Sequence, residues 1–397
     1  MNRYPRQIAV RATFMRGGTS KGVFFTPDDL PEAARTPGKI RDALLLRVIG
    51  SPDPYGKHID GMGGATSSTS KIVIVSKSER PDCDVDYLFG QVAIDRPLVD
   101  WSGNCGNLTS AVGPFAIARG LIAAPRDGHA TIRIWQANIS KMIIAHVPMM
   151  DGEVVELGEF ELDGVTFPAA EVKLEFLDPG ADEESAGGAM FPTGRRMDIV
   201  EVPGIGAVEA TLINAGLPTV FVDAKTLGLK GTELQDEVNT DPGLLTRCET
   251  VRAHAAVAMG LARSAAEASE KHLHTPKLAF VAPPAAYTAS SGKEVAADDI
   301  DLVARIFSMG KLHHAMTGTG AVAIAVAAAV PGTLLRRILG GVSRESVRFG
   351  HPSGTLSVGA ETVQRGAEWV VTKAIMSRSA RRLMDGAVLV PNSVLSV

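Results

Sequence analysis

The chain of 397 residues has few cysteines, few aromatic residues and no excess of positive charge. Its three cysteines, Cys83, Cys105 and Cys248, are far apart and form no Cys-x-x-Cys pair, so neither a disulfide framework nor a zinc site is supported. The net charge of −4 and the 5% aromatic content provide no basic, aromatic-rich surface for nucleic acid. We therefore expect no metal and no nucleic-acid partner.

Long apolar segments are also missing. The longest apolar run, Ala321 to Val330, is too short to span a bilayer, and Met1 to Arg11 is charged where a signal peptide would be apolar. We expect a cytoplasmic protein with no membrane contact. The length exceeds the roughly 250–300 residues at which a single hydrophobic core stops growing, which favours two domains.

Several segments alternate apolar and polar residues with the period of a half-buried strand. These segments are 71–75, 86–94, 131–135, 142–146 and 347–349. Helical patterns are fewer and cover 30–49, 108–119, 244–264, 299–309, 321–330 and 374–384. Because strands and helices do not alternate regularly, the pattern predicts an α+β protein. The Pro-, Gly- and acid-rich stretch 178–188 is either a linker or a surface loop.

Two of the predicted helices, 108–118 and 321–330, have no charged face, and we expect both to be buried all round. Each follows a polar segment that contains glycine, 102–107 before the first helix and 316–320 before the second. Two buried helices that each begin after a Gly-containing turn indicate two similar halves.

The starts of these two helices are candidate anion sites. Helix N-termini have unpaired N–H groups and partial positive charge, and Gly106 and Gly318 would open the approach for a ligand carboxylate. The alternative is that Asn104, Asn107 and Thr317 cap the helices and nothing binds. Spacing alone leaves both interpretations open.

Three further features add candidate groups. Cys105 lies at a helix start, where the local field favours the thiolate. The turn 15–22 concentrates charge, hydroxyls and glycine in a form that can wrap carboxylate oxygens. The loop 60–71 ends at Lys71, which is a solvated strand end unless an apolar pocket buries it and lowers its pKa, in which case it can act as a general base.

The histidines form no zinc motif. His272, His274, His313 and His314 do not have the i, i+4 spacing with a glutamate, and surface or packing roles are expected for them. His351 precedes a turn and a strand that we expect to reach the cleft.

Taken together, several motifs resemble those of the PrpF family, the 2-methylaconitate cis-trans isomerases of the methylcitrate route of propionate breakdown. The motifs are 14–25, 50–56, 59–64, Ser67-Ser-Thr-Ser-Lys71, 84–89 and Gly103-Asn-Cys-Gly-Asn107. The resemblance continues through 214–218, 274–277, 351–354 and 377–381, so it covers essentially the whole chain.

The resemblance implies an α+β fold like that of diaminopimelate epimerase, with two similar domains that are each a β-barrel wrapped around a central apolar helix. The expected domains are 1–187 and 188–374, with 375–397 packing back on the first domain. In the epimerase each helix start supplies a cysteine. Cys105 matches the first position, but 317–321 has threonine at the second, which puts a two-thiol mechanism in doubt.

The resemblance further implies a cofactor-independent isomerase in which Lys71 removes an allylic proton from a small tricarboxylate. The expected substrate is 2-methylaconitate, with aconitate as a second one. Cys105 would be a second acid or a contact to the anion, and the amides of Gly106, Asn107 and Gly318 would stabilise the anion. The substrate-binding candidates are Arg16, Gly17, Thr19, Ser20, Lys21, Ser67, Asn104, Gly106, Asn107, Met316, Thr317, Gly318 and His351.

Other substrates and another class of protein stay open at this point. The family also includes enzymes similar to oxalomesaconate tautomerases and methylitaconate isomerases, although segments 51–57 and 101–105 favour 2-methylaconitate. A non-catalytic carboxylate-binding protein would have the same pocket without needing a base. The sequence does not determine the oligomeric state and leaves a homodimer open.

Overall fold

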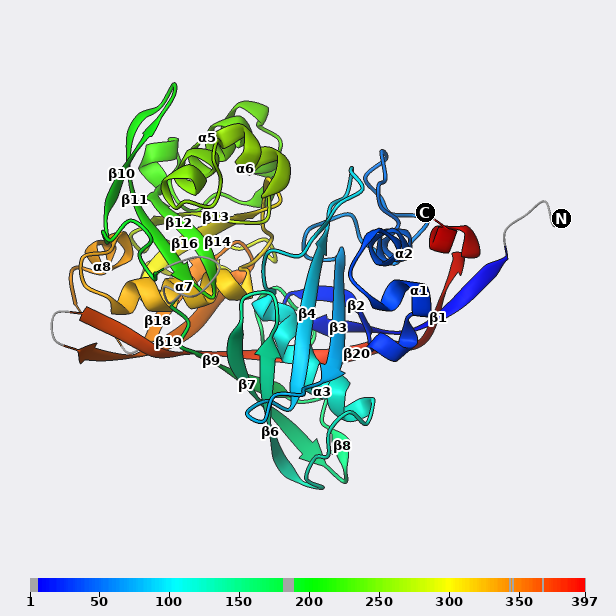
Figure 1. Cartoon of the computed structure of the whole chain (residues 1–397). Helices are drawn as coiled ribbons and strands as arrows, with labels where there is room; N and C mark the ends of the chain where they lie inside the picture. Colours follow the sequence, from blue (N-terminus) through cyan, green and yellow to red (C-terminus); the bar gives the residue numbers. More distant parts are fainter. Residues whose placement is uncertain (1–5, 181–188, 343, 345, 366–367, 397) are drawn as a thin grey trace.

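The structure is a computed structural model and describes residues 6–180, 189–342, 344, 346–365 and 368–396. Figure 1 shows the blue and cyan segments gathered on one side and the green, yellow and orange segments on the other. We call these the N-terminal and C-terminal lobes. The expected boundary at 187/188, and most of the stretch 178–188, lie outside the described residues.

The N-terminal lobe contains β1 (Gln7–Gly17), β2 (Ser20–Phe25), α1 (Glu32–Arg35), α2 (Lys39–Ile49), β3 (Lys71–Lys77), β4 (Val85–Val92), β5 (Val99–Asp100), α3 (Gly106–Ala118), β6 (Gly128–Gln136), β7 (Lys141–Met150), β8 (Glu153–Val154) and β9 (Glu171–Leu177).

The C-terminal lobe contains β10 (Asp198–Val202), β11 (Gly206–Ala215), β12 (Leu217–Asp223), α4 (Gln235–Asn239), α5 (Pro242–Ala258), α6 (Ala265–Lys271), β13 (Lys277–Ala282), β14 (Tyr287–Thr288), β15 (Glu294–Val295), β16 (Leu302–Ser308), β17 (Lys311–Leu312), α7 (Gly318–Ala329), α8 (Leu334–Ile338), β18 (Ser346–His351) and β19 (Gly354–Arg365). The last strand, β20 (Glu368–Pro391), runs along both lobes (Figure 1). Single 3₁₀ turns occupy Pro27–Asp29, Ala224–Leu227, Ala297–Asp299 and Asn392–Ser396.

Each lobe surrounds one apolar helix. Helix α3 packs against β1, β2, β3, β6, β7, β9 and β20, and its residues up to Ala116 are buried. Helix α7 packs against β11, β12, β18, β19 and β20, and every one of its residues is buried. The predicted all-round burial of both helices is confirmed, because each sequence lacks a charged face that would need solvent.

The long strand β20 connects the two lobes. It pairs antiparallel with β1 and β9 of the N-terminal lobe and with β19 of the C-terminal lobe. In the described residues, eighteen strands belong to one continuous hydrogen-bonded network. The two helices are therefore held in place by a single set of strand pairings.

The N-termini of α3 and α7 meet at two glycines. A Cβ atom added to Gly106 would lie 2.8 Å from the carbonyl carbon of Gly318 and 2.9 Å from the amide nitrogen of Thr319. Real Cβ atoms essentially never approach other atoms this closely. Only glycine at both positions allows the two helix starts to come into backbone contact.

The five predicted strands are confirmed in β3, β4, β6, β7 and β18. The predicted helix 30–49 is broken, because Pro37 and Gly38 separate α1 from α2. The helix predicted for 299–309 is wrong, since this segment forms the fully buried strand β16, and periodicity alone does not distinguish a short buried strand from a helix.

The helix predicted for 374–384 is also wrong, because the segment belongs to β20 and its partners β1 and β9 decide its conformation. None of the helices in the described ranges combines the length and the apolar content that a membrane-spanning helix requires.

Replacing Gly318 with alanine is expected to lower the free energy of unfolding by about 1–3 kcal/mol, because the added methyl group would overlap the backbone of Gly106. Urea unfolding followed by circular dichroism measures this change. Gly386→Ala in β20 is the matched control, since a Cβ there meets nothing within 4 Å and should change stability by less than about 0.5 kcal/mol. Equal stability of the two variants would contradict the helix-to-helix contact.

Candidate active site

Lys71 is buried at the start of β3, with only 5% of its surface exposed. Its Nζ donates a hydrogen bond to Gln91 Oε1 at 2.6 Å and lies 4.9 Å from the centre of the Phe89 ring. Burial lowers the pKa of Lys71, while its interaction with Cys105 acts in the opposite direction. The amine is therefore placed beside the thiol and is easier to deprotonate than an ordinary lysine.

The strand register explains why these groups meet. Strands β3 and β4 are antiparallel, with Lys71 opposite Gln91 and Val73 opposite Phe89. Gln91 also donates through Nε2 to the carbonyl oxygen of Ser70 at 3.1 Å, which fixes its amide. Gln91 was not predicted as a site residue. The alternating pattern of 86–94 places it in a strand but does not show which residue of the neighbouring strand it faces.

Cys105 occupies the N-cap position of α3, and its side chain makes no capping hydrogen bond. Its carbonyl oxygen accepts from the Thr109 amide at 3.0 Å and from the Tyr87 hydroxyl at 3.2 Å. Thr317, by contrast, caps α7 through its hydroxyl, which accepts from the Gly320 amide at 3.1 Å. The expected Thr317 cap is therefore present at α7, while the N-cap side chain of α3 is left available for chemistry.

Asn104 is the clearest unsatisfied group near the helix start. Its side chain is 1% exposed, and neither the amide nitrogen nor the amide oxygen has a hydrogen-bond partner. A buried polar group without a partner costs about 1–3 kcal/mol, so such groups in a folded protein are commonly explained by a ligand or water. The position immediately before Cys105 makes Asn104 a strong candidate for contact with a ligand.

Asn107 joins three segments at the same place. Its Nδ2 donates to Thr19 Oγ1 at 3.0 Å and to the Met316 carbonyl oxygen at 3.2 Å, and its Oδ1 accepts from Arg378 Nε at 2.9 Å. A Cβ at Gly17 would lie 2.7 Å from the Asn107 carbonyl oxygen, so the end of β1 also contacts this point. The structure thus brings four of the predicted site residues together and adds Arg378, which the sequence marked only as part of the motif 377–381 and not as a site residue.

An open pocket of about 480 Å³ lies beside this cluster. The turn between β1 and β2 lines it with Arg16, Thr19, Ser20 and Lys21. The other lining residues include Ser68, Thr69, Glu156, His314 and Arg381. The Arg16 guanidinium donates to the carbonyl oxygens of Gly18 and Ser379. Burial and the neighbouring Arg381 lower the pKa of Arg16. The pocket therefore presents two cationic side chains from the predicted wrapping turn, Arg16 and Lys21.

Two predicted binding residues, Ser67 and His351, are not among the residues that contact Asn107. Ser67 is half-buried next to Ser68, which lines the open pocket. His351 ends β18 and is fully buried, and its Nδ1 accepts from the Ser353 amide at 3.2 Å. Burial lowers the pKa of His351 to about 3, so its ring is neutral. Contact of either residue with a substrate stays a prediction.

A second buried lysine faces the site from the C-terminal lobe. Lys277 begins β13, is 2% exposed, and donates to His274 Nδ1 and to Ser308 Oγ, each at 3.1 Å. Burial, followed by the charge of Lys71, lowers its pKa to about 7. His274 and Lys277 lie in the family motif 274–277, but neither was predicted as a site residue, because the motif does not show that both are buried.

Of the surface or packing roles expected for His274 and His313, burial of both side chains supports packing. Burial also lowers the pKa of each well below its usual value. Across the described residues, no group of three or more histidine, cysteine, aspartate or glutamate side chains is arranged to hold a metal ion.

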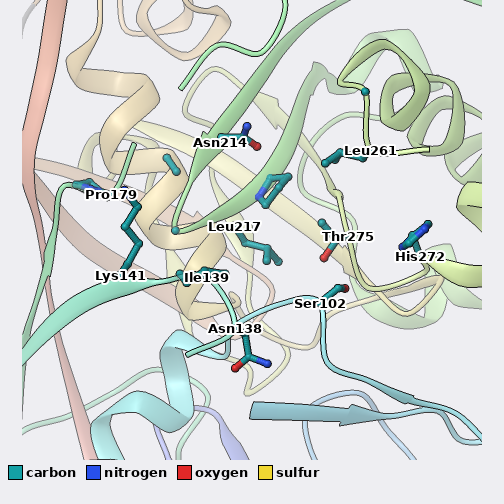
Figure 2. A pocket seen from close by; sticks show the side chains of 14 residues that line it. Ser102, Asn138, Ile139, Lys141, Pro179, Asn214, Leu217, Leu261, His272 and Thr275 are labelled. Carbon is teal, nitrogen blue, oxygen red and sulfur yellow. The ribbon is translucent and has the colours of Figure 1, made fainter. Parts of the chain in front are cut away.

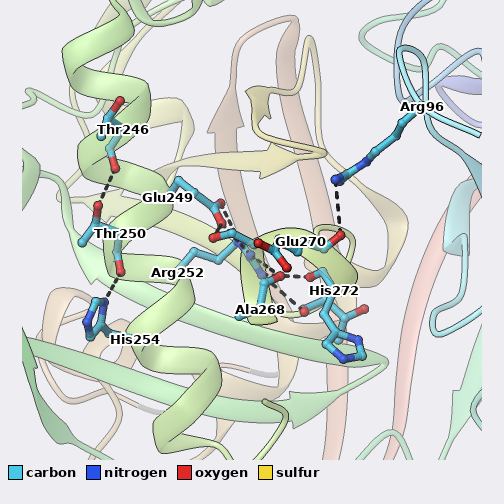
Figure 3. Close-up of polar contacts among 11 residues, drawn as sticks. Arg96, Thr246, Glu249, Thr250, Arg252, His254, Ala268, Glu270 and His272 are labelled. Carbon is cyan, nitrogen blue, oxygen red and sulfur yellow. Dashed lines mark hydrogen bonds and ion pairs between the residues drawn. The ribbon is translucent and has the colours of Figure 1, made fainter. Parts of the chain in front are cut away.

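Arg252 fixes the turn that leads into β13 (Figure 3). Its guanidinium donates to the carbonyl oxygens of Ala268 and His272 at 3.0 Å and of Thr275 at 3.3 Å. The same group pairs with Glu249 at 2.7 Å. The buried arginine thereby holds the segment from which His274 and Lys277 extend.

A smaller pocket of about 350 Å³ lies between the lobes (Figure 2). Ser102 and Asn138 line it from the N-terminal lobe, and Leu217, His272 and Thr275 line it from the C-terminal lobe. The Thr275 hydroxyl is buried and has no hydrogen-bond partner. The pocket therefore borders the two segments that lead to Cys105 and Lys277.

The arrangement suits proton transfer at carbon next to a carboxylate. A buried amine with a lowered pKa can accept a proton, and a thiol lies beside it. The adjoining starts of α3 and α7 offer amide groups and partial positive charge that stabilise a delocalised carboxylate-derived anion.

Comparison with solved structures places the fold in a known class. The crystal structure described as methylitaconate-delta-isomerase is 36% identical and superposes with a TM-score of 0.75, covering 98% of this chain and 97% of that chain. A probable proline racemase from Agrobacterium radiobacter, 10% identical, gives a TM-score of 0.55 over 97% of this chain and 95% of that chain. The fold is therefore that of the racemase and isomerase structures related to diaminopimelate epimerase, as predicted.

Comparison with sequences gives the family. Residues 7–391 match the family described as PrpF protein. A protein of Shewanella oneidensis described as 2-methyl-aconitate isomerase is 66% identical over 391 residues, which is 98% of each chain. One of Cupriavidus necator with the same description is 65% identical over 388 residues, covering 97% of this chain and 98% of the relative. The chain belongs to the PrpF family.

Arg252→Met is expected to lower the free energy of unfolding by about 3 kcal/mol, because it leaves Glu249 without its partner and three carbonyl groups without their donor. Chemical denaturation measures the loss. Arg337→Met is the control, since its ion pair with Glu209 is solvent-exposed and should contribute only about 0–1 kcal/mol. Similar losses in both variants would show that the turn before β13 does not depend on Arg252.

Proposed function

We propose that this protein is a cofactor-independent isomerase that converts the cis and trans forms of 2-methylaconitate by shifting an allylic proton. The observation that carries the proposal is the buried Lys71 amine, held by Gln91 beside Cys105 and next to the start of α3. The two relatives with 65–66% identity support the choice of substrate. We further propose that the enzyme acts in the cytoplasm, in the methylcitrate route of propionate breakdown.

In the proposed reaction, neutral Lys71 accepts a proton from the methylene carbon next to a carboxylate of the substrate. The C–H bond breaks and its electron pair spreads over the double bond and the carboxylate as a dienolate. Amides of Gly106, Asn107 and Gly318 stabilise this anion. Rotation about the carbon–carbon bond that has lost double-bond character, followed by return of the proton from the Lys71 ammonium, gives the isomer and restores the amine.

Cys105 has a secondary role in the proposed mechanism. It lies beside the Lys71 amine and keeps the pKa of that amine from falling further. Its thiol either donates a proton or contacts the anion. With threonine at the corresponding start of α7, a pair of thiols exchanging one proton is not part of the proposal.

We also propose that the two lobes are two similar domains, each a β-barrel around its apolar helix, with the C-terminal segment packing on the first domain. The burial of α3 and α7 among the strands of their own lobes and the pairing of β20 with β1 support this division.

Replacing Lys71 with alanine is expected to lower kcat by about 10²–10⁴-fold, the range that general acid–base groups contribute. Turnover of 2-methylaconitate and exchange of its methylene protons with deuterated water measure the effect. Lys293→Ala is a control, since that lysine forms an exposed ion pair with Asp163. Normal turnover by Lys71→Ala would refute its role as base, and absence of exchange by the wild type with every tricarboxylate tested would refute the isomerase.

The pH dependence of kcat should report the Lys71 amine. Activity requires the neutral amine, so it falls as the pH drops through the pKa of Lys71, and the midpoint should lie below the ordinary lysine value of 10.5. Gln91→Met removes an acceptor that favours the ammonium form, so the midpoint should move to lower pH. A midpoint that moves upward, or does not move, would contradict this assignment.

Relative rates on three substrates distinguish the alternatives within the family. We expect kcat/KM to be higher for 2-methylaconitate than for methylitaconate or oxalomesaconate, because the relatives with 65–66% identity are described as 2-methyl-aconitate isomerases. Higher values for either alternative would reassign the substrate, and binding without turnover of any of them would favour the non-catalytic carboxylate-binding protein.

A further inference from the structure

We propose that Asp163 is a positioning residue for the reaction, because its carboxylate holds a loop of the N-terminal lobe against the C-terminal lobe beside the open pocket. The reaction that it serves rests on the proposed function. The contact between the lobes rests on the hydrogen bonds and close approaches described below.

Asp163 stands on a short loop of the N-terminal lobe, residues 160–169, which lies between β8 and β9. The ends of this loop are joined by two backbone hydrogen bonds between Phe160 and Ala169, at 3.0 and 3.1 Å. At its turn the amide of Val165 donates to the carbonyl oxygen of Leu162 at 2.9 Å, and the Leu162 side chain is buried in the apolar core. The loop is therefore held in one shape with Asp163 at its turn.

The Asp163 carboxylate reaches the C-terminal lobe. Its Oδ2 accepts a hydrogen bond from the Thr355 amide at the start of β19, at 2.7 Å. Its other oxygen pairs with Lys293 at 2.9 Å, but this lysine is half exposed, so the ion pair contributes little. A backbone N–H bonded to a charged carboxylate is the stronger contact of the two. We call it the Asp163–Thr355 contact.

Gly354 makes room for this contact. A Cβ atom on Gly354 would overlap Oδ2 of Asp163, so only glycine allows the carboxylate to reach the neighbouring amide. Gly354 belongs to the motif 351–354, and the proposed proton transfer gives this glycine no role. The Asp163–Thr355 contact supplies a physical reason for it.

The same loop forms part of the wall of the open pocket. Residues 164–169 line that pocket together with Arg16, Thr19 and Lys21. A Cβ on Gly164 would lie 3.0 Å from Thr19 Cγ2 and 3.2 Å from Ala315 Cβ, so the loop packs where the two lobes meet. Thr19 in turn accepts a hydrogen bond from Asn107 at the start of α3. Release of Asp163 would therefore loosen a wall of the pocket.

The contact should act on binding more than on the chemical step. The groups assigned to the reaction come from both lobes, Lys71 and Cys105 from one and Gly318 from the other. When the loop is released, the fraction of molecules with a closed site falls, and the apparent affinity for substrate falls with it. Proton transfer takes place in the closed form, so its rate constant is kept.

Steady-state kinetics of the full-length protein on 2-methylaconitate test this role. Asp163→Ala should raise KM by about 10-fold and leave kcat within about three-fold, as expected for loss of a hydrogen bond to a charged group that stabilises the closed form. Asp163→Asn keeps a side-chain oxygen for the Thr355 amide and should restore most of the affinity. Lys293→Gln removes only the ion pair and should behave as the wild type, as should Asp28→Ala, which removes an exposed partner of Arg35.

Hydrogen–deuterium exchange followed by mass spectrometry tests the contact without turnover. Asp163→Ala should speed exchange in peptides that contain Thr355 and in the 160–169 loop, because both lose their partner across the lobes. Gly354→Ala should give the same pattern, since its methyl group displaces the carboxylate. In the wild type, the saturated tricarboxylate tricarballylate should slow exchange of the 160–169 loop.

An unchanged KM in Asp163→Ala, a fall in kcat at unchanged KM, or a raised KM in Lys293→Gln would each overturn this proposal. Unchanged exchange at Thr355 in Asp163→Ala would do the same. If the wild type isomerises no tricarboxylate but the exchange changes at Thr355 and in the 160–169 loop are observed, the proposed function fails and the contact between the lobes stands.

Discussion

The backbone contact between Gly106 and Gly318 is the constraint on which the site depends. It brings the N-termini of two buried helices together, and with them the partial positive charge and unpaired amides of both. Any side chain at either glycine would separate the helices. Cys105 and Asn104 come immediately before one helix and Met316 and Thr317 immediately before the other, so their proximity follows from this single contact.

The strands bring the cations to the same point from three directions. Lys71 and Lys277 each begin a strand, and Arg378 lies within β20, which pairs with strands of both lobes. The apolar cores around α3 and α7 keep water away from these side chains. Desolvation therefore lowers the pKa of both lysines, which makes Lys71 suitable as a base.

Part of this site could be predicted from the sequence. The position of Cys105 at a helix start follows from the uncharged segment after it, and the family motifs indicate Lys71. Gln91 could not be found in this way, because nothing next to it in the sequence marks it. Lys277 and Arg378 lie in the family motifs 274–277 and 377–381, but neither motif shows that these side chains are buried at the site. Their importance comes from cross-strand register and from packing between lobes, which no local pattern encodes.

Helices and strands were likewise predicted correctly where local sequence determines them and wrongly where tertiary partners do. The sequence by itself determined the two apolar helices, the five alternating strands and the family, because a missing charged face, a period of two and long motifs are local properties. Only the tertiary structure decided that 299–309 and 374–384 are strands, since buried apolar runs take the conformation that their partners impose. It also decided which polar side chains are buried together, because desolvation and charge pairing depend on neighbours distant in the chain.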